Sequence, residues 1–71
     1  MEMTFDEYLM NVEVAYRDNP EWRWGQTYWN VLDDERPDLA HLLTLTELDP
    51  FHKEPNQLGE FLAWLGDHWI N

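Results

Sequence analysis

The sequence has no cysteine, no serine and only four basic residues in 71 positions. The lack of cysteine excludes disulfides, thiolate zinc sites and a cysteine nucleophile. The lack of serine removes the commonest hydroxyl nucleophile, and so short a chain can hardly enclose a pocket of about 300 Å³ beside a core. No apolar run approaches the roughly 20 residues that span a bilayer. We therefore expect a protein that is not an enzyme, needs no cofactor and does not enter a membrane.

Positive charge is scarce as well. Four Lys and Arg stand against fifteen Asp and Glu, which gives a net charge of -11. Attraction to phosphate supplies most of the affinity for nucleic acids and anionic lipids, so we expect no direct binding to either. An acidic surface is instead steered towards basic proteins. Residues 1–6 carry neither a basic region nor a signal-type apolar stretch, so we expect a cytoplasmic location.

What the chain does contain is a core. Apolar and aromatic residues make up 44% of it, with five Trp, three Tyr and three Phe, which is too hydrophobic for an acidic disordered tail. The length predicts a single domain over residues 1–71. A core of this size supplies only about 3–5 kcal/mol, so we expect the fold to depend on buried rings and helix caps.

The first helix is predicted from a capping box. Thr4 and Glu7 have the required spacing, and Pro20 disfavours helical geometry in the residue before it, so the helix should end near 18–19. Its apolar stripe consists of Phe5, Tyr8, Leu9, Val12 and Tyr16.

A second helix is predicted to start at Asn19 as N-cap with Pro20 in its first position, and to cover residues 21–32. Few of its positions are polar, so it should lie centrally and be contacted from two sides. Gly25 lies inside this predicted helix, where glycine is less stable than alanine by about 1 kcal/mol. We expect that the missing side chain lets the backbone of this helix approach a neighbouring helix or a bulky ring closely.

Residues 33–37 break the pattern, and Pro37 is predicted to open a short third helix that ends near Leu45. Residues 49–51 should form a turn that inserts a phenyl ring into the core. Asn56 is expected to cap a final helix. The stripe of this helix consists of Leu58, Phe61, Leu62, Leu65 and Trp69. The sequence thus predicts an all-α, single-domain helical bundle with three main helices and a shorter fourth.

Carboxylates and histidines are the two residue types in this sequence that could ligate a metal. Four carboxylates precede the third helix, namely Asp33, Asp34, Glu35 and Asp38. They lack the spacing and central glycine of a calcium loop, so a solvated acidic cap is expected rather than a metal site. The three histidines are His41, His52 and His68. None forms an i, i+4 zinc pair, so each is expected at the surface or its boundary.

Aromatic residues in the second helix could in principle stack on bases. That mode also needs a basic groove, and the four basic residues do not supply one. We therefore expect most rings to lie in the core, with Trp24 or Trp69 the best candidates for partial exposure.

Four motifs spread over most of the chain show a resemblance. They are Trp22–Gln26, Arg36–Ala40, Asp49–Phe51 and Phe61–Leu65. Together they resemble a group of small acidic proteins encoded by phages and prophages. The resemblance implies a host-directed inhibitor of defence or nucleic-acid enzymes, of the anti-CRISPR kind, and assigns no functional residue.

The leading hypothesis is a small acidic inhibitor that occupies a basic, nucleic-acid-binding groove on a host protein, in the manner of a DNA mimic. The predicted contact set flanks the third helix and consists of Asp33, Asp34, Glu35, Asp38, Glu47 and Asp49. One alternative is a structural or assembly protein that works as a homodimer or larger homo-oligomer. Another is an immunity protein or antitoxin against a basic toxin, which shares the same charge logic.

Overall fold

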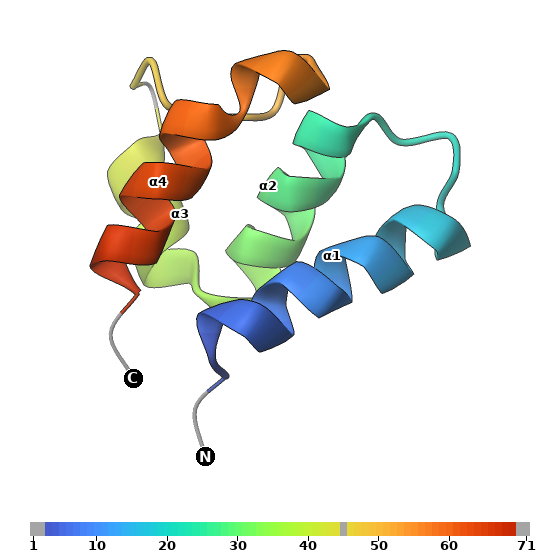
Figure 1. Cartoon of the computed structure of the whole chain (residues 1–71), viewed down its shortest axis with the longest axis horizontal. Helices are drawn as coiled ribbons and strands as arrows, with labels where there is room; N and C mark the ends of the chain where they lie inside the picture. Colours follow the sequence, from blue (N-terminus) through green and yellow to red (C-terminus); the bar gives the residue numbers. More distant parts are fainter. Residues whose placement is uncertain (1–2, 45, 70–71) are drawn as a thin grey trace.

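The computed structural model describes residues 3–44 and 46–69. Within these ranges the chain forms α1 (Phe5–Asp18), α2 (Trp24–Glu35), α3 (Pro37–Leu43), a 3₁₀ turn η1 (Pro55–Gln57) and α4 (Gly59–His68), with no strand. The all-α prediction is confirmed. α2 lies between α1 and α3 and contacts both, as its largely apolar sequence predicted (Figure 1). No helix in the described ranges has the length and apolar character needed to cross a membrane.

The start of α1 is the predicted capping box. The backbone N–H of Glu7 donates to Oγ1 of Thr4 at 3.1 Å, and the N–H of Thr4 donates to Oε1 of Glu7 at 2.9 Å. The helix ends at Asp18, where Asn19 caps it. Both the backbone N–H and the side-chain amide of Asn19 donate to the carbonyl oxygen of Ala15, at 2.9 and 3.0 Å.

The predicted start of α2 is wrong, because Asn19 ends α1 instead of opening the next helix. A turn follows Asn19, closed by the N–H of Trp22 on the carbonyl of Asn19 at 2.9 Å. α2 begins only at Trp24, after Arg23, whose side chain makes no capping hydrogen bond. The hydroxyl of Thr27 donates to the carbonyl of Arg23 at 2.9 Å and so supports this first turn.

The predicted end of α2 is also wrong, because the helix runs through residues 33–35 and stops at Glu35. The break comes at Arg36, since the residue before a proline is kept out of the helical region. Arg36 ends α2 and precedes α3, and its N–H donates to the carbonyl of Leu32 at 2.7 Å. α3 ends at Leu43, and the predicted end at Leu45 lies outside the described residues.

Gly25 makes the close approach that was expected, although its neighbour is a loop backbone. A Cβ atom at this position would collide with the carbonyl oxygen of Pro50 and lie 2.7 Å from that of Lys53. Pro50 is fully buried, whereas Phe51 is half-buried and packs edge-on against His52. The turn therefore buries a proline and not the predicted phenyl ring, and the backbone of this proline is held against Gly25.

α4 also starts differently from the prediction. Asn56 is exposed within η1, and the cap forms around this turn instead, with the N–H of Glu54 donating to Oε1 of Gln57 at 2.9 Å. Trp69, expected to be partly exposed, is only 7% exposed. Its indole N–H donates to the carbonyl of Met3 at 2.9 Å, which joins the two ends of the described chain.

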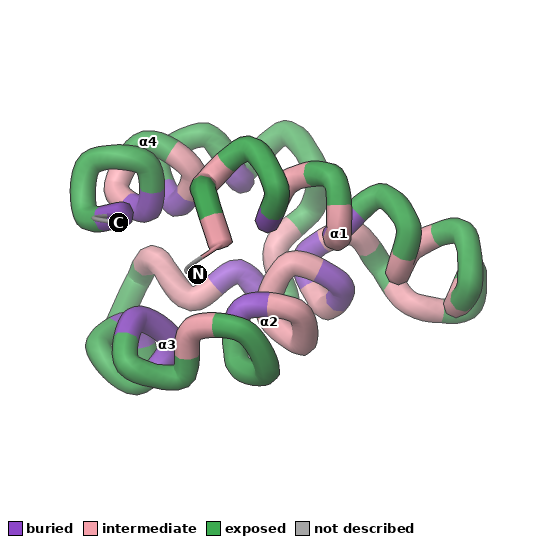
Figure 2. The backbone as a smooth tube through the Cα atoms, turned by 90° about the horizontal axis from the view of Figure 1, so that it is seen from below, coloured by how far each residue is buried: buried purple, intermediate pink, exposed green. Residues whose placement is uncertain are grey.

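The core forms where the four helices face one another (Figure 2). Its centre is a group of rings, in which Tyr8 lies 5.1 Å from Trp69 and Tyr28 lies 5.8 Å from Phe61, between ring centroids. The hydroxyl of Tyr8 donates to the carbonyl of Tyr28 at 2.8 Å. Such ring pairs contribute about 0.5–1.5 kcal/mol beyond the area they bury. Buried rings thus support this small fold, as expected from composition.

Candidate functional site

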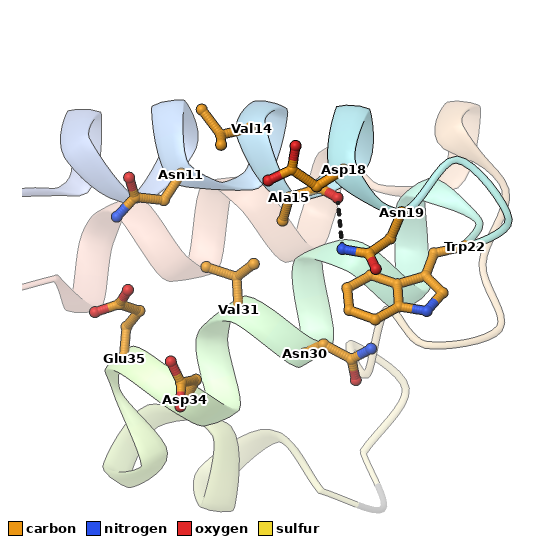
Figure 3. Close-up of a pocket in the computed structure, with 10 residues that line it drawn as sticks. All are labelled: Asn11, Val14, Ala15, Asp18, Asn19, Trp22, Asn30, Val31, Asp34 and Glu35. Carbon is orange, nitrogen blue, oxygen red and sulfur yellow. Dashed lines mark hydrogen bonds between the residues drawn. The ribbon is translucent and has the colours of Figure 1, made fainter.

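A groove of about 590 Å³ runs between α1 and α2 and is called here the α1/α2 groove (Figure 3). Ten residues line it: Asn11, Val14, Ala15, Asp18 and Asn19 on the α1 side, Trp22 in the connection, and Asn30, Val31, Asp34 and Glu35 on α2. The two helices diverge from the turn that connects them. The groove is therefore closed at the Trp22 end and open between Asn11 and Glu35.

The floor of the α1/α2 groove is apolar. Ala15 and Val31 lie across from each other on the two helices, and the Trp22 ring covers the closed end (Figure 3). Val14 is 50% exposed, and Met10, one turn earlier on α1, is 66% exposed. Solvent thus reaches apolar side chains of α1 at and beside the groove.

The rim of the groove is acidic. Asp18 stands on the α1 side, and Asp34 and Glu35 stand on the α2 side near the open end (Figure 3). All three side chains are exposed, and none of the described residues that line the groove is basic. The arrangement can therefore receive an apolar group with positive charges beside it.

The predicted contact set falls into two parts, separated by α3. Asp33, Asp34 and Glu35 form the last turn of α2, and Asp38 lies in the first turn of α3. These four stand together at the α2–α3 junction, and two of them, Asp34 and Glu35, also line the α1/α2 groove.

Glu47 and Asp49 lie beyond the other end of α3, which is about 10 Å long at 1.5 Å per residue. Asp49 is half-buried, and its Oδ1 accepts the backbone N–H of Phe51 at 3.0 Å. Asp49 therefore has a local structural role in the turn, whereas Glu47 is exposed.

Arg36 organises the junction. Its guanidinium donates to both carboxylate oxygens of Asp38, at 3.1 and 3.0 Å, and lies 4.9 Å from the centre of the Trp69 ring. The hydrogen bonds from Arg36 lower the pKa of the Asp38 carboxyl. Asp38 is therefore engaged within the chain, while α2 has no basic residue in its own last turn to balance Asp33–Glu35.

Two tyrosines in the core have shifted pKa values. Loss of solvation on burial raises the pKa of Tyr8, and the nearby Tyr28 raises it further. Burial also raises the pKa of Tyr28, with a contribution from the negative charge of Glu13. Both phenols therefore stay neutral at physiological pH, which suits packing and not proton transfer.

A second hollow of about 400 Å³ lies between α1, α2 and the start of α4. It is lined by Leu9, Glu13, Trp24, Tyr28, Pro55, Leu58 and Leu62. Trp24 is half-buried here, as expected, and stacks on Tyr16 with ring centroids 3.8 Å apart. With one acidic residue in its lining, this hollow lacks the charge pattern of the α1/α2 groove.

The histidines do not converge on a site. His41, His52 and His68 are all exposed, as predicted, and His68 stacks on Trp64 with ring centroids 4.0 Å apart. Within residues 3–44 and 46–69, no group of three or more His, Asp or Glu side chains is arranged to hold a metal ion.

Sequence reasoning missed the groove itself, including Val14, Asp18, Trp22 and Val31. One signal was present: Met10 and Val14 are apolar residues four positions apart that lie outside the predicted core stripe of α1. Apolar residues outside the core stripe were thus the part of the sequence that pointed to exposed apolar surface on α1.

No protein-family model matches this chain, and neither a curated protein nor a solved structure does. The resemblance to small phage proteins stays a prediction, because no match tests it. The acidic junction and the α1/α2 groove are thus the features from which a function can be inferred.

Proposed function

We propose that this protein is an acidic inhibitor that binds a basic, nucleic-acid-binding surface of a host protein and blocks it. The observation that carries the proposal is the last turn of α2, where three exposed carboxylates, Asp33–Glu35, follow one another. A helix C-terminus has a partial negative charge, so each carboxylate there opposes folding, by about 0.3–1 kcal/mol at low salt. Three consecutive exposed carboxylates at this position place negative charge where a basic partner can reach it.

The charge of the whole chain supports the same role. Eleven net negative charges are distributed over an accessible surface of 4825 Å². Side chains on neighbouring helix positions lie about 5–6 Å apart, a spacing close to that between phosphates. The carboxylates at the α2–α3 junction can therefore compete for a groove that normally holds a nucleic-acid backbone.

The proposal is tested by affinity capture from nuclease-treated host lysate, with identification of the bound proteins by mass spectrometry. The wild-type chain is compared with the D33N/D34N/E35Q variant at low and at high salt. We expect a nucleic-acid-binding protein that is captured by the wild type at low salt, is lost with the variant and is displaced by its own DNA or RNA. Capture of no such protein, or equal capture by both chains, would contradict the proposal.

A second candidate function, assembly as a homo-oligomer, has one observation in its favour. Met10 and Val14 expose apolar surface side by side on α1, as subunit contacts often do. The net charge of -11 opposes it, because two copies would bring acidic rims together. Sedimentation over a range of concentrations distinguishes a homo-oligomer from a single chain, and we expect a monomer at micromolar concentration.

An immunity or antitoxin role uses the same acidic surface and would be recognised by the identity of the captured partner.

A further inference from the structure

We infer that the α1/α2 groove is the docking site for a short amphipathic helix of the partner, which presents an apolar side chain flanked by Lys or Arg. This inference rests on the proposed function and adds the place of contact and the chemistry of the bound segment. Its basis is the combination of an apolar floor and an acidic rim in one groove.

The floor accounts for the apolar part of the occupant. Ala15 and Val31 offer methyl groups from both helices, Val14 adds exposed methyl groups on the outer edge of α1, and Trp22 forms a flat wall at the closed end (Figure 3). Asn19 at this end already donates to the carbonyl of Ala15. The closed end therefore holds no charged side chain, and the Trp22 ring lies there beside the amides of Asn19 and Asn30. A Leu-sized side chain that enters from the open end can pack against the Trp22 ring and the methyl groups of Ala15 and Val31.

The acidic rim of the groove explains why the bound helix should carry Lys or Arg. Asp18 and the pair Asp34 and Glu35 stand on opposite sides of the groove, so bases on both sides of the apolar side chain have a carboxylate to meet. In helical peptides, side chains three or four residues apart share a face. A Lys–x–x–Leu–x–x–Lys pattern would thus match a central floor between two acidic edges.

The length of the groove limits the occupant to a short helix. On α1 the lining runs from Asn11 to Asn19, which is about 12 Å at 1.5 Å per residue. That length accommodates about two helical turns. A single helix of a larger partner fits this space, whereas a whole domain can reach it only through a projecting helix.

A second copy of this chain is a poor occupant. Within the described residues, Arg17 pairs with Glu13 at 3.8 Å and Arg36 pairs with Asp38 at 3.0 Å, so half of the four basic residues already meet carboxylates. A copy would also bring its own net charge of -11 against the acidic rim. Charge complementarity therefore favours a basic partner.

The test uses two synthetic peptides of about 12 residues, one with the Lys–x–x–Leu–x–x–Lys pattern and one in which Gln replaces Leu. Binding to the full chain is measured by calorimetry in low salt and mapped by NMR of the methyl groups. We expect the Leu peptide to bind about tenfold more tightly than the Gln peptide. We also expect the largest shifts at the methyl groups of Val14, Ala15 and Val31.

Two matched pairs of variants separate the groove from general charge. Val14→Gln should weaken binding of the Leu peptide about fivefold, while Leu42→Gln, at a residue 59% exposed on α3, should leave binding unchanged. D18N/D34N/E35Q should weaken binding about tenfold more than D6N/E60Q/D67N, which removes the same number of charges elsewhere. Thermal melts confirm that each variant is folded.

The binding measurements separate failure of the docking site from failure of the proposed attraction to basic partners. Equal binding of both peptides, with equal effects within each pair of variants, would overturn the docking site while leaving the proposal of a basic partner standing. Methyl shifts that depend on protein concentration without peptide would identify a second copy as the occupant and overturn the inference. Binding of neither peptide would contradict both the docking site and the proposed attraction to basic partners.

Discussion

The carbonyl oxygens of Pro50 and Lys53 face the Cα atom of Gly25 in the first turn of α2, where any larger residue would meet them. These oxygens belong to backbone and cannot swing aside as a side chain can. A second tight fit is made by Tyr8, which is fully buried and donates its hydroxyl proton to the carbonyl of Tyr28. The missing side chain of Gly25 therefore lets α2 pack against the connection before α4, and the hydroxyl of Tyr8 joins α1 to α2.

We predict that Gly25→Ala destabilises the fold by about 1–3 kcal/mol, the usual range for overpacking a tight site. The higher helix propensity of alanine offsets this by about 1 kcal/mol at most. The matched control is Gly66→Ala in α4, where the nearest atom to a new Cβ is a Phe5 ring carbon at 3.5 Å. The control should be neutral or stabilising. Urea unfolding of the three chains measures the difference, and a Gly25→Ala chain as stable as the control would show that the 50–53 turn yields freely.

We predict that stability falls as the pH rises above about 10 and that Tyr8 is one cause. Its folded pKa lies above the ordinary value of about 10, so its contribution is complete below that pH. Above pH 10 the unfolded phenol ionises first, and stability is lost by up to about 1.4 kcal/mol per pH unit for one such group. Tyr8→Phe should cost about 1 kcal/mol at pH 7 and make the alkaline loss shallower. Urea unfolding between pH 7 and 11 measures both, and an unchanged alkaline slope in the variant would contradict the assignment.

Among the elements, α1 and α2 show opposite relations between charge and helix dipole. α1 has Asp6 and Glu7 in its first turn, which is favourable, and in its last turn the basic Arg17 stands beside the acidic Asp18. α2 has no acidic residue in its first turn and no basic residue in its last, where Asp33–Glu35 lie. Charge thus supports the start of α1, whereas the end of α2 carries three consecutive carboxylates that interact unfavourably with its dipole.

We predict that D33N/D34N/E35Q raises the free energy of unfolding by about 1–2 kcal/mol at pH 7 and low salt. The gain should shrink at high salt, because screening weakens the unfavourable interaction with the dipole. The control is Asp6→Asn at the start of α1, which should lower stability slightly because it removes a favourable charge. Chemical unfolding compares the two variants. A triple variant less stable than the wild type would mean that these carboxylates make stabilising contacts.

The elements also show what the sequence could predict. The Thr4 capping box was predictable, because all of its partners lie within four residues. The role of Asn19 was not, because it is a good cap for either of two helices and only its hydrogen bond to Ala15 decides between them. The α2–α3 junction was predicted as an acidic cluster. The groove beside it depends on how far α1 and α2 diverge, which is a tertiary property.

For the whole molecule, the excess of negative charge opposes folding and favours binding to basic partners. The net charge of -11 is carried by a compact chain with a radius of gyration of 11.2 Å, so like charges are closer in the folded state than in an expanded one. The same negative charge attracts basic partners over distances comparable to the Debye length, about 10 Å at 0.1 M salt. The acidic surface through which we propose that a partner binds therefore also weakens the fold that presents it.

We predict that added salt stabilises this protein while it weakens its complexes. Raising the salt concentration from about 0.01 M to 0.3 M shortens the Debye length from about 30 Å to less than 8 Å. The melting temperature should rise over this interval, because self-repulsion is screened, and the affinity for the basic Leu peptide should fall over the same interval. Thermal melts and calorimetry in identical buffers, with chloride as the only anion varied, measure both trends. A melting temperature that falls with added chloride would show that local ion pairs such as Arg36–Asp38 outweigh the repulsion between the remaining carboxylates.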